Sequence, residues 1–249
     1  MKVQLVSYKS TLRASSRLHK TIDIVNSSTA DLILFAGHTL TKYEDVFELN
    51  QNIKNKQVCA IIEVKTNSSS KINIKKNSLF LLQNGVVRDM FTSQLFRDSH
   101  NIIAYPKLAE HLLLDLETRR KFHIANREVI VIQCGENGIL RNVQSEGNKA
   151  VFRFKDDKKL NMRFENILKN ANIILNPIHS PMGNQGKMCK RREYFSNHNR
   201  VYLSSANFSD EDSINNKSVQ YACINGIEQK PINIEIGYRN SYIIRTFVI

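Results

Sequence analysis

The sequence lacks several features that would assign it to a common class of protein. It has no tryptophan and only four cysteines in 249 residues. None of its apolar runs approaches the roughly 18 residues that are needed to span a bilayer. The opening residues, MKVQLVSYKSTL, alternate too regularly for a secretory signal and are typical of a strand. We therefore expect a cytoplasmic protein with no membrane partner.

The cysteines are also too scattered for a structural role. They lie far apart in the sequence and form no CxxC pair: Cys59, Cys134, Cys189 and Cys223. This spacing does not match zinc ligands, and nothing else in the chain suggests a disulfide framework. We expect four reduced thiols, three of them inert, with no metal and no cofactor.

Positive charge is the dominant feature of the composition. The chain has 36 Lys and Arg against 23 Asp and Glu, a formal net charge of +13. Such an excess favours acidic partners, including nucleic acid. Only residues 155–164 and 187–193 can contribute to one basic face, and neither segment has the interleaved aromatics of a base-stacking platform. We expect 187–193 to be a solvated basic helix face first and a phosphate-binding patch second. We expect nucleic-acid binding to be weak and sequence-independent.

The hydrophobic pattern alternates strands with helices along the chain. It predicts strands within 2–8, 30–37, 58–66, 127–138, 172–181 and 200–208, and helices within 14–28, 45–56, 148–171 and 188–199. Asn84-Gly85 predicts a hairpin turn between strands at 78–83 and 86–93. Residues 68–77 have the pattern of a polar hairpin-like connection, and 218–238 that of two antiparallel strands. With no repeat or linker, we expect one layered α/β domain over 1–249.

The stretch VIVIQCGENGIL, residues 129–140, raises the functional question. Its apolar run ends at Cys134 and passes at once into Gly135 and Glu136. The thiol is either an ordinary core cysteine at a strand end or a nucleophile displayed on a tight strand-to-helix turn. Gly135 suits the second alternative, because it has no side chain to hinder a sharp turn.

Taken in order, these segments resemble the nitrilase, or carbon–nitrogen hydrolase, superfamily. The resemblance rests on MKVQLVSYKSTL, ADLILFAG, NSLFLLQNGVVRDMF, REVIVIQCGE, ANIILNPIHSP and NRVYLSSANF. It implies a four-layer α-β-β-α sandwich with two central mixed sheets. It also implies a small-molecule amide or nitrile as substrate, and a homodimer formed through the helices that follow the elbow.

The resemblance further implies a cysteine nucleophile, a glutamate base and a lysine. A thiol is largely protonated at pH 7, so a base must take its proton. The tetrahedral intermediate then needs fixed positive charge or hydrogen-bond donors. By the resemblance, Cys134 stands at the nucleophile position and Glu136 at the acidic position two residues later.

The other two positions of this triad have lost their function. Gly37 stands where the glutamate is expected, and Thr92 stands where the lysine is expected. Loss of a positioned base typically costs about 10²–10⁴-fold in rate. The nearest acids after the first position and the nearest cations around the second do not restore the pattern: Glu44, Asp45, Arg88 and Arg97.

Two residues are candidate substitutes, although each is more commonly structural or exposed. His179 follows a strand end on the expected active-site side, and Glu110 falls where the family often has an accessory glutamate. Residues 141–164 form an insertion after the elbow. Two functions stay open: a hydrolase that is impaired or uses substitute residues around Cys134, and a non-catalytic module that binds a small molecule, an acidic protein or nucleic acid.

Overall fold

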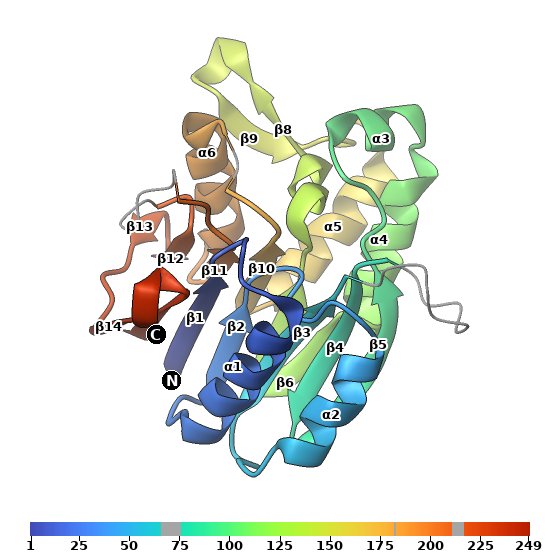
Figure 1. The fold of residues 1–249 in the computed structure, drawn as a ribbon. Helices are drawn as coiled ribbons and strands as arrows, with labels where there is room; N and C mark the ends of the chain where they lie inside the picture. Colours follow the sequence, from blue (N-terminus) through green and yellow to red (C-terminus); the bar gives the residue numbers. More distant parts are fainter. Residues whose placement is uncertain (66–75, 182, 211–216) are drawn as a thin grey trace.

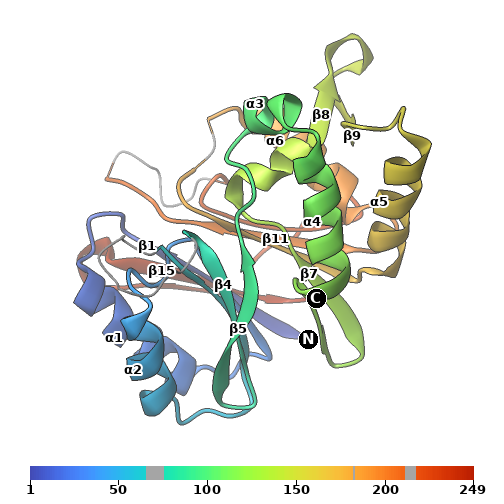
Figure 2. The same cartoon turned by 90° about the vertical axis from the view of Figure 1, so that its right-hand side faces the viewer.

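The computed structural model describes residues 1–65, 76–181, 183–210 and 217–249. Most of the predicted connection at 68–77 therefore lies outside the described residues. Two mixed β-sheets pack face to face, and helices cover both outer faces (Figures 1 and 2). The expected α-β-β-α sandwich is confirmed.

The first sheet has seven strands in the order β14-β15-β1-β2-β3-β4-β5. β1, β2 and β3 run parallel, and antiparallel neighbours flank them on both sides. The bounds are β1 Lys2–Tyr8, β2 Leu32–Phe35, β3 Cys59–Val64, β4 Ser78–Gln83, β5 Val86–Ser93, β14 Asn233–Ile236 and β15 Tyr242–Val248.

The second sheet has six strands in the order β13-β12-β11-β10-β7-β6. Here β7, β10 and β11 are the parallel centre. The bounds are β6 Lys121–Ile124, β7 Arg127–Val131, β10 Ile173–Ile178, β11 Val201–Ala206, β12 Gln220–Ile224 and β13 Ile227–Glu228.

The helices cover the sheets with one apolar face each. α1 and α2 pack on the first sheet through residues such as Leu18, Val25 and Leu49, whereas α4 and α5 pack on the second through Leu112 and Phe164. The bounds are α1 Ala14–Ser27, α2 Glu44–Asn52, α3 Ser99–Ala104, α4 Lys107–Thr118, α5 Lys158–Asn170 and α6 Gln185–Ser196. Short 3₁₀ turns are η1 Cys134–Ile139, η2 Gln144–Glu146 and η3 Tyr238–Asn240. No helix within the described ranges combines the length and apolarity that crossing a bilayer requires.

Two local predictions have clear outcomes. The Asn84-Gly85 hairpin is confirmed, because both residues take positive φ, at 56° and 75°, as a primed turn requires. The prediction of two antiparallel strands in 218–238 is only partly right. β12 and β13 do pair, but β14 joins β15 in the other sheet. Single-strand periodicity carries no information on which sheet a strand enters.

The insertion forms a hairpin that projects from the body of the sandwich, at the top of Figure 1. Its strands are β8 Leu140–Val143 and β9 Lys149–Phe152, and α5 follows. The hairpin is tied to α6, because Arg191 Nε donates to Asn142 Oδ1 at 3.0 Å and Asn142 Nδ2 donates to the Lys187 carbonyl at 3.2 Å.

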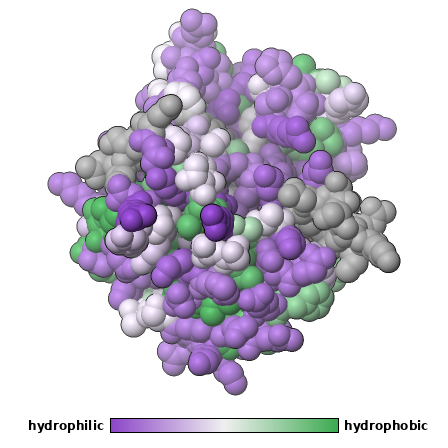
Figure 3. Space-filling model, viewed as in Figure 1, coloured by the Kyte–Doolittle hydropathy of each residue, from purple (hydrophilic) through white to green (hydrophobic). Residues whose placement is uncertain are grey.

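The expectation that 187–193 is a solvated basic face is only partly right. Lys187 is exposed, and Lys190 pairs within the helix with Glu193 at 2.9 Å. Arg192, however, is only 3% exposed, with its guanidinium 4.3 Å from the centre of the Tyr221 ring, and Arg191 is bonded to the hairpin. The two arginines therefore hold α6 in place. The face drawn in Figure 3 is nevertheless largely hydrophilic.

Candidate active site

The strand-to-turn elbow forms as the sequence predicts. After β7, Cys134 opens the 3₁₀ turn η1 and is partly buried. A glycine is required at position 135 because the Arg97 backbone lies very close to it. A Cβ at this position would lie 1.7 Å from the Arg97 carbonyl oxygen. Any side chain at 135 would push the Arg97 segment away from the elbow.

A buried network behind the elbow fixes its shape. Glu136 is fully buried, forms an ion pair with the fully buried Arg120, and accepts backbone N–H groups from Gln133 at 2.9 Å and Leu95 at 2.7 Å. Each of these bonds holds η1 to a neighbouring segment. The contacts of Glu136 therefore stabilise the turn.

The lysine position belongs to the same network. Thr92 donates to Asp115 and accepts from Arg120 Nε at 2.9 Å, while Arg120 also donates to the Ser93 carbonyl at 2.7 Å. Thr92 is 5% exposed. The cation nearest this position is thus Arg120, 28 residues further along the chain, rather than Arg88 or Arg97.

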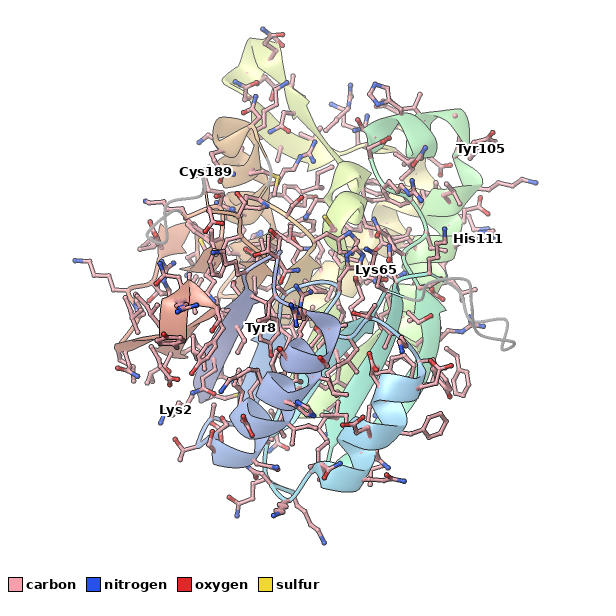
Figure 4. The ribbon with its side chains drawn as sticks, viewed as in Figure 1. Lys2, Tyr8, Lys65, Tyr105, His111 and Cys189 are labelled. Atoms are coloured by element: carbon pink, nitrogen blue, oxygen red, sulfur yellow. The ribbon has the colours of Figure 1, made fainter. Side chains whose placement is uncertain are left out.

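A pocket of about 330 Å³ opens over the thiol. Lys65, which is labelled in Figure 4, directly follows β3 at its edge. The lining residues are His38, Lys65, Lys76, Asn77, Gln94, Arg97, Cys134 and His179. His179 and Cys134 thus line the same pocket, and the backbone N–H of His179 bonds to the thiol.

Glu63 supplies a buried carboxylate beneath this pocket. It comes from β3, next to the strand that carries the family's base position, and is 1% exposed. His179 Nε2 lies 2.6 Å from Glu63 Oε1, and Gln133 Nε2 donates to Oε2 at 2.7 Å. Burial alone would raise the pKa of Glu63, but these bonds and the nearby histidines outweigh it and lower the pKa. Glu63 is therefore ionised at pH 7.

His38 stacks on His179, with ring centroids 3.7 Å apart and planes 15° from parallel. Burial, then repulsion from His179, lowers the pKa of His38 to about 4, so this ring is neutral at pH 7. Asn77 Nδ2 donates to Gln94 Oε1 at 2.8 Å, which turns Asn77 Oδ1 toward His38 Nε2 at 3.0 Å. The neutral ring therefore carries its proton on Nε2 and donates it to Asn77.

His179 occupies the space that a side chain at Gly37 would need. A Cβ at Gly37 would lie 2.4 Å from His179 Cδ2. The two residues are thus complementary: the glycine leaves room, and the histidine fills it. A glutamate at 37 and this histidine cannot coexist in the observed arrangement.

The resting thiol is protonated. Burial, followed by repulsion from Glu63 and Glu136, raises the pKa of Cys134 to about 11, although backbone N–H groups of His179 and Ser180 bond to the thiol and oppose this. A nucleophilic role therefore needs a base that removes the proton as sulfur attacks.

His38, Glu63 and His179 are also the group that could hold a metal ion, since their ligand atoms lie within 4.8 Å of one another. The observed geometry fits a hydrogen-bonded set better. The ring nitrogens already have hydrogen-bond partners, because His179 Nε2 lies 2.6 Å from Glu63 Oε1 and His38 Nε2 lies 3.0 Å from Asn77 Oδ1.

The remaining candidate lies elsewhere. Glu110 is exposed on α4, where its charge acts on Arg163, and it does not line the pocket. Sequence reasoning missed Glu63, His38 and Gln133. A signal for Glu63 existed: it is the one acidic residue in CAIIEV, a strand buried at every position.

Comparison with known proteins agrees with this architecture. No family model and no curated protein matches the sequence. Among solved structures, an amidase of the nitrilase superfamily from Nesterenkonia AN1 matches with a TM-score of 0.57 and 9% identity over 99% of this chain and 90% of that one. The fold is nitrilase-like.

Two further structures support the same conclusion. A CN-hydrolase superfamily protein from Xanthomonas campestris, with an arsenic adduct in its active site, matches with a TM-score of 0.52 and 8% identity over 100% of this chain and 91% of that one. A glutamine-dependent NAD(+) synthetase from Cytophaga hutchinsonii matches with a TM-score of 0.59 and 9% identity over 99% of this chain. This chain spans only 42% of that synthetase.

Proposed function

We propose that the protein is a carbon–nitrogen hydrolase of the nitrilase type in which Glu63 and His179 replace the missing base. The observation that carries this proposal is the 2.6 Å bond between a fully buried carboxylate and a histidine that lines the Cys134 pocket. A buried carboxylate orients a histidine and stabilises its protonated form, which suits proton transfer from a thiol.

The proposed reaction has two steps. As Cys134 Sγ attacks the amide carbon, its proton passes to His179 and then to the leaving nitrogen, so that ammonia or an amine departs and a thioester remains. Water, deprotonated by the same histidine, then releases the acid and the thiol. The backbone N–H groups of His179 and Ser180 that bond to the sulfur favour its thiolate form as the proton leaves.

The second candidate is a binding module without catalysis. The observation in its favour is the raised pKa of Cys134, because a poorly ionised thiol is inert unless a base assists it. Under this candidate, iodoacetamide labels Cys134 only as the pH rises toward 11, and no amide forms a thioester with it.

The test measures ammonia release and thioester formation with a panel of short amides. The variants are Cys134→Ala, Glu63→Gln and His179→Gln. We expect no turnover from Cys134→Ala and a loss of roughly 10²–10⁴-fold from each of the others, since each removes part of the base. Thioester formation is followed by intact-protein mass.

A matched control uses the exposed pair on β6 and β7. His123 and Glu128 lie 3.8 Å apart at the surface, and His123→Gln and Glu128→Gln should leave turnover unchanged. Full activity in His179→Gln would contradict the assigned base. A wild-type protein that binds amides but never forms a thioester would favour the binding module.

A further inference from the structure

We infer that the pocket selects a small amide or nitrile that also carries an anionic group, a carboxylate or a phosphate. This inference rests on the proposed function for the bond that is broken, but anion binding can be measured without it. The proposed occupant places its carbon–nitrogen bond at Cys134 and its negative charge against the cations at the rim.

The lining of the pocket has a single sign of charge. Lys65, Lys76 and Arg97 line it, and none of the other described lining residues is an Asp or Glu. A neighbouring pocket of about 320 Å³ shares Lys76 and Arg97 and likewise has no acidic lining residue. Clefts lined by one sign of charge concentrate ligands of the opposite sign.

Within the described part of the chain, no salt bridge uses these three side chains. Asp98, next to Arg97 in the chain, is exposed, and the charge of Arg97 contributes to lowering its pKa. Cations without a salt-bridge partner are the ones that gain most from an anionic ligand. The scattered lysines elsewhere, such as Lys190 and Lys217, have glutamate partners instead.

The positive charge of the lining cations acts on the groups inside the pocket. Lys65 contributes to lowering the pKa of His38, so its field acts inside the pocket. Arg97 is held at the mouth, because its backbone lies against Gly135 and its N–H donates to Asn101 Oδ1 at 3.0 Å. The two buried carboxylates close by already have partners, because Glu63 is bonded to His179 and Gln133, and Glu136 is bonded to Arg120. The rim cations are thus left to a ligand.

The experiment uses three amides of matched length: succinamate, phosphonopropanamide and neutral butyramide. Each is titrated calorimetrically into Cys134→Ala, the variant from which no turnover is expected. We expect at least one anionic amide to bind roughly tenfold or more tightly than butyramide, with an affinity that falls as salt is added. The anionic amide that binds more tightly shows whether the pocket prefers a carboxylate or a phosphate-like group.

The triple variant Lys65→Gln/Lys76→Gln/Arg97→Gln, in the same background, should remove this preference. A control with the same loss of charge uses exposed side chains away from the pocket: Arg13→Gln/Lys54→Gln/Lys107→Gln. This control should retain the preference.

Butyramide binding as tightly as both anions, or an unchanged preference in the pocket triple variant, would overturn the inference. The two proposals fail separately. Succinamate that binds but is never hydrolysed by the wild type contradicts the proposed function alone. Butyramide hydrolysed as fast as both anionic amides contradicts only the anion preference.

Discussion

Two buried glutamates flank the elbow, and they differ in what surrounds them. Glu136 lies behind the turn, where Arg120 and two backbone N–H groups engage both of its oxygens. Glu63 lies in front, bonded to His179, a side chain that opens onto the pocket. The first carboxylate is enclosed by groups that do not titrate near neutrality, and the second is bonded to one that does.

The different partners of Glu136 and Glu63 point to a structural role for the first and a chemical role for the second. A carboxylate held by an arginine and by amides fixes geometry, because none of its partners gives up a proton near pH 7. A carboxylate held by histidine can take part in proton transfer. The sequence singled out Glu136 because it lies two residues after the cysteine. The residue to which a carboxylate is bonded is therefore a better guide to its role than its position in the sequence.

The largest effect is expected from breaking the rear network. Arg120→Met leaves Glu136 and Asp115 without their buried cation, which should lower the free energy of unfolding by roughly 3–5 kcal/mol. Denaturant unfolding measures this. Arg119→Met, which removes an exposed arginine on the next residue, is the control and should cost less than about 1 kcal/mol. Equal losses in the two variants would show that burial of the pair is unimportant.

A smaller effect concerns the front cluster and pH. The pKa of His38 falls from 6.5 to about 4 on folding, so the unfolded chain binds more protons between these values. Stability is then fully present above pH 6.5 and declines as the pH falls toward 4, by about 2–3 kcal/mol from this residue. Unfolding measured from pH 4 to 7 should show a flatter profile for His38→Gln. The same slope in both proteins would rule out His38 as the source.

A further test compares the effect of an added Cβ at Gly37 with its effect at a loop glycine that has free space around it. The Cβ of Gly37→Ala meets the His179 ring, so we expect a loss of about 1–3 kcal/mol in stability and reduced turnover as the ring moves. Gly183→Ala, where nothing lies within 4 Å of an added Cβ, is the control. Unchanged turnover in Gly37→Ala would contradict the proposed dependence of turnover on the position of His179.

The smallest effect is expected at the candidate that the pocket excludes. Glu110 is exposed on α4, so Glu110→Gln should change stability by no more than about 0.5 kcal/mol and leave turnover unchanged. Steady-state kinetics beside Glu63→Gln provides the comparison. A large loss of turnover from Glu110→Gln would mean that the active site extends to α4.

Much of the fold follows from the sequence because the apolar periodicities of β1, β2, β3 and β10 are local properties. The elbow at Cys134 was predictable for the same reason. Partners distant in sequence were not. Glu63 and His179 are 116 residues apart and meet only through sheet packing, and Arg120 reaches Thr92 across 28 residues. A motif aligned position by position finds a glycine at position 37, but not the buried carboxylate of Glu63 on the neighbouring strand.

The contact between Gly135 and the Arg97 carbonyl has a consequence for engineering. The backbone of Arg97 and the turn that carries Cys134 meet at this contact, so a mutant library that varies residue 135 displaces both segments together. Lys65 and Lys76 come from a different segment, which meets the elbow through a hydrogen bond from Gln133 Nε2 to the Asn77 carbonyl at 2.8 Å. Under the proposed anion preference, the side chains of Lys65 and Lys76 are therefore the ones to vary when the Gly135 contact is to be left intact.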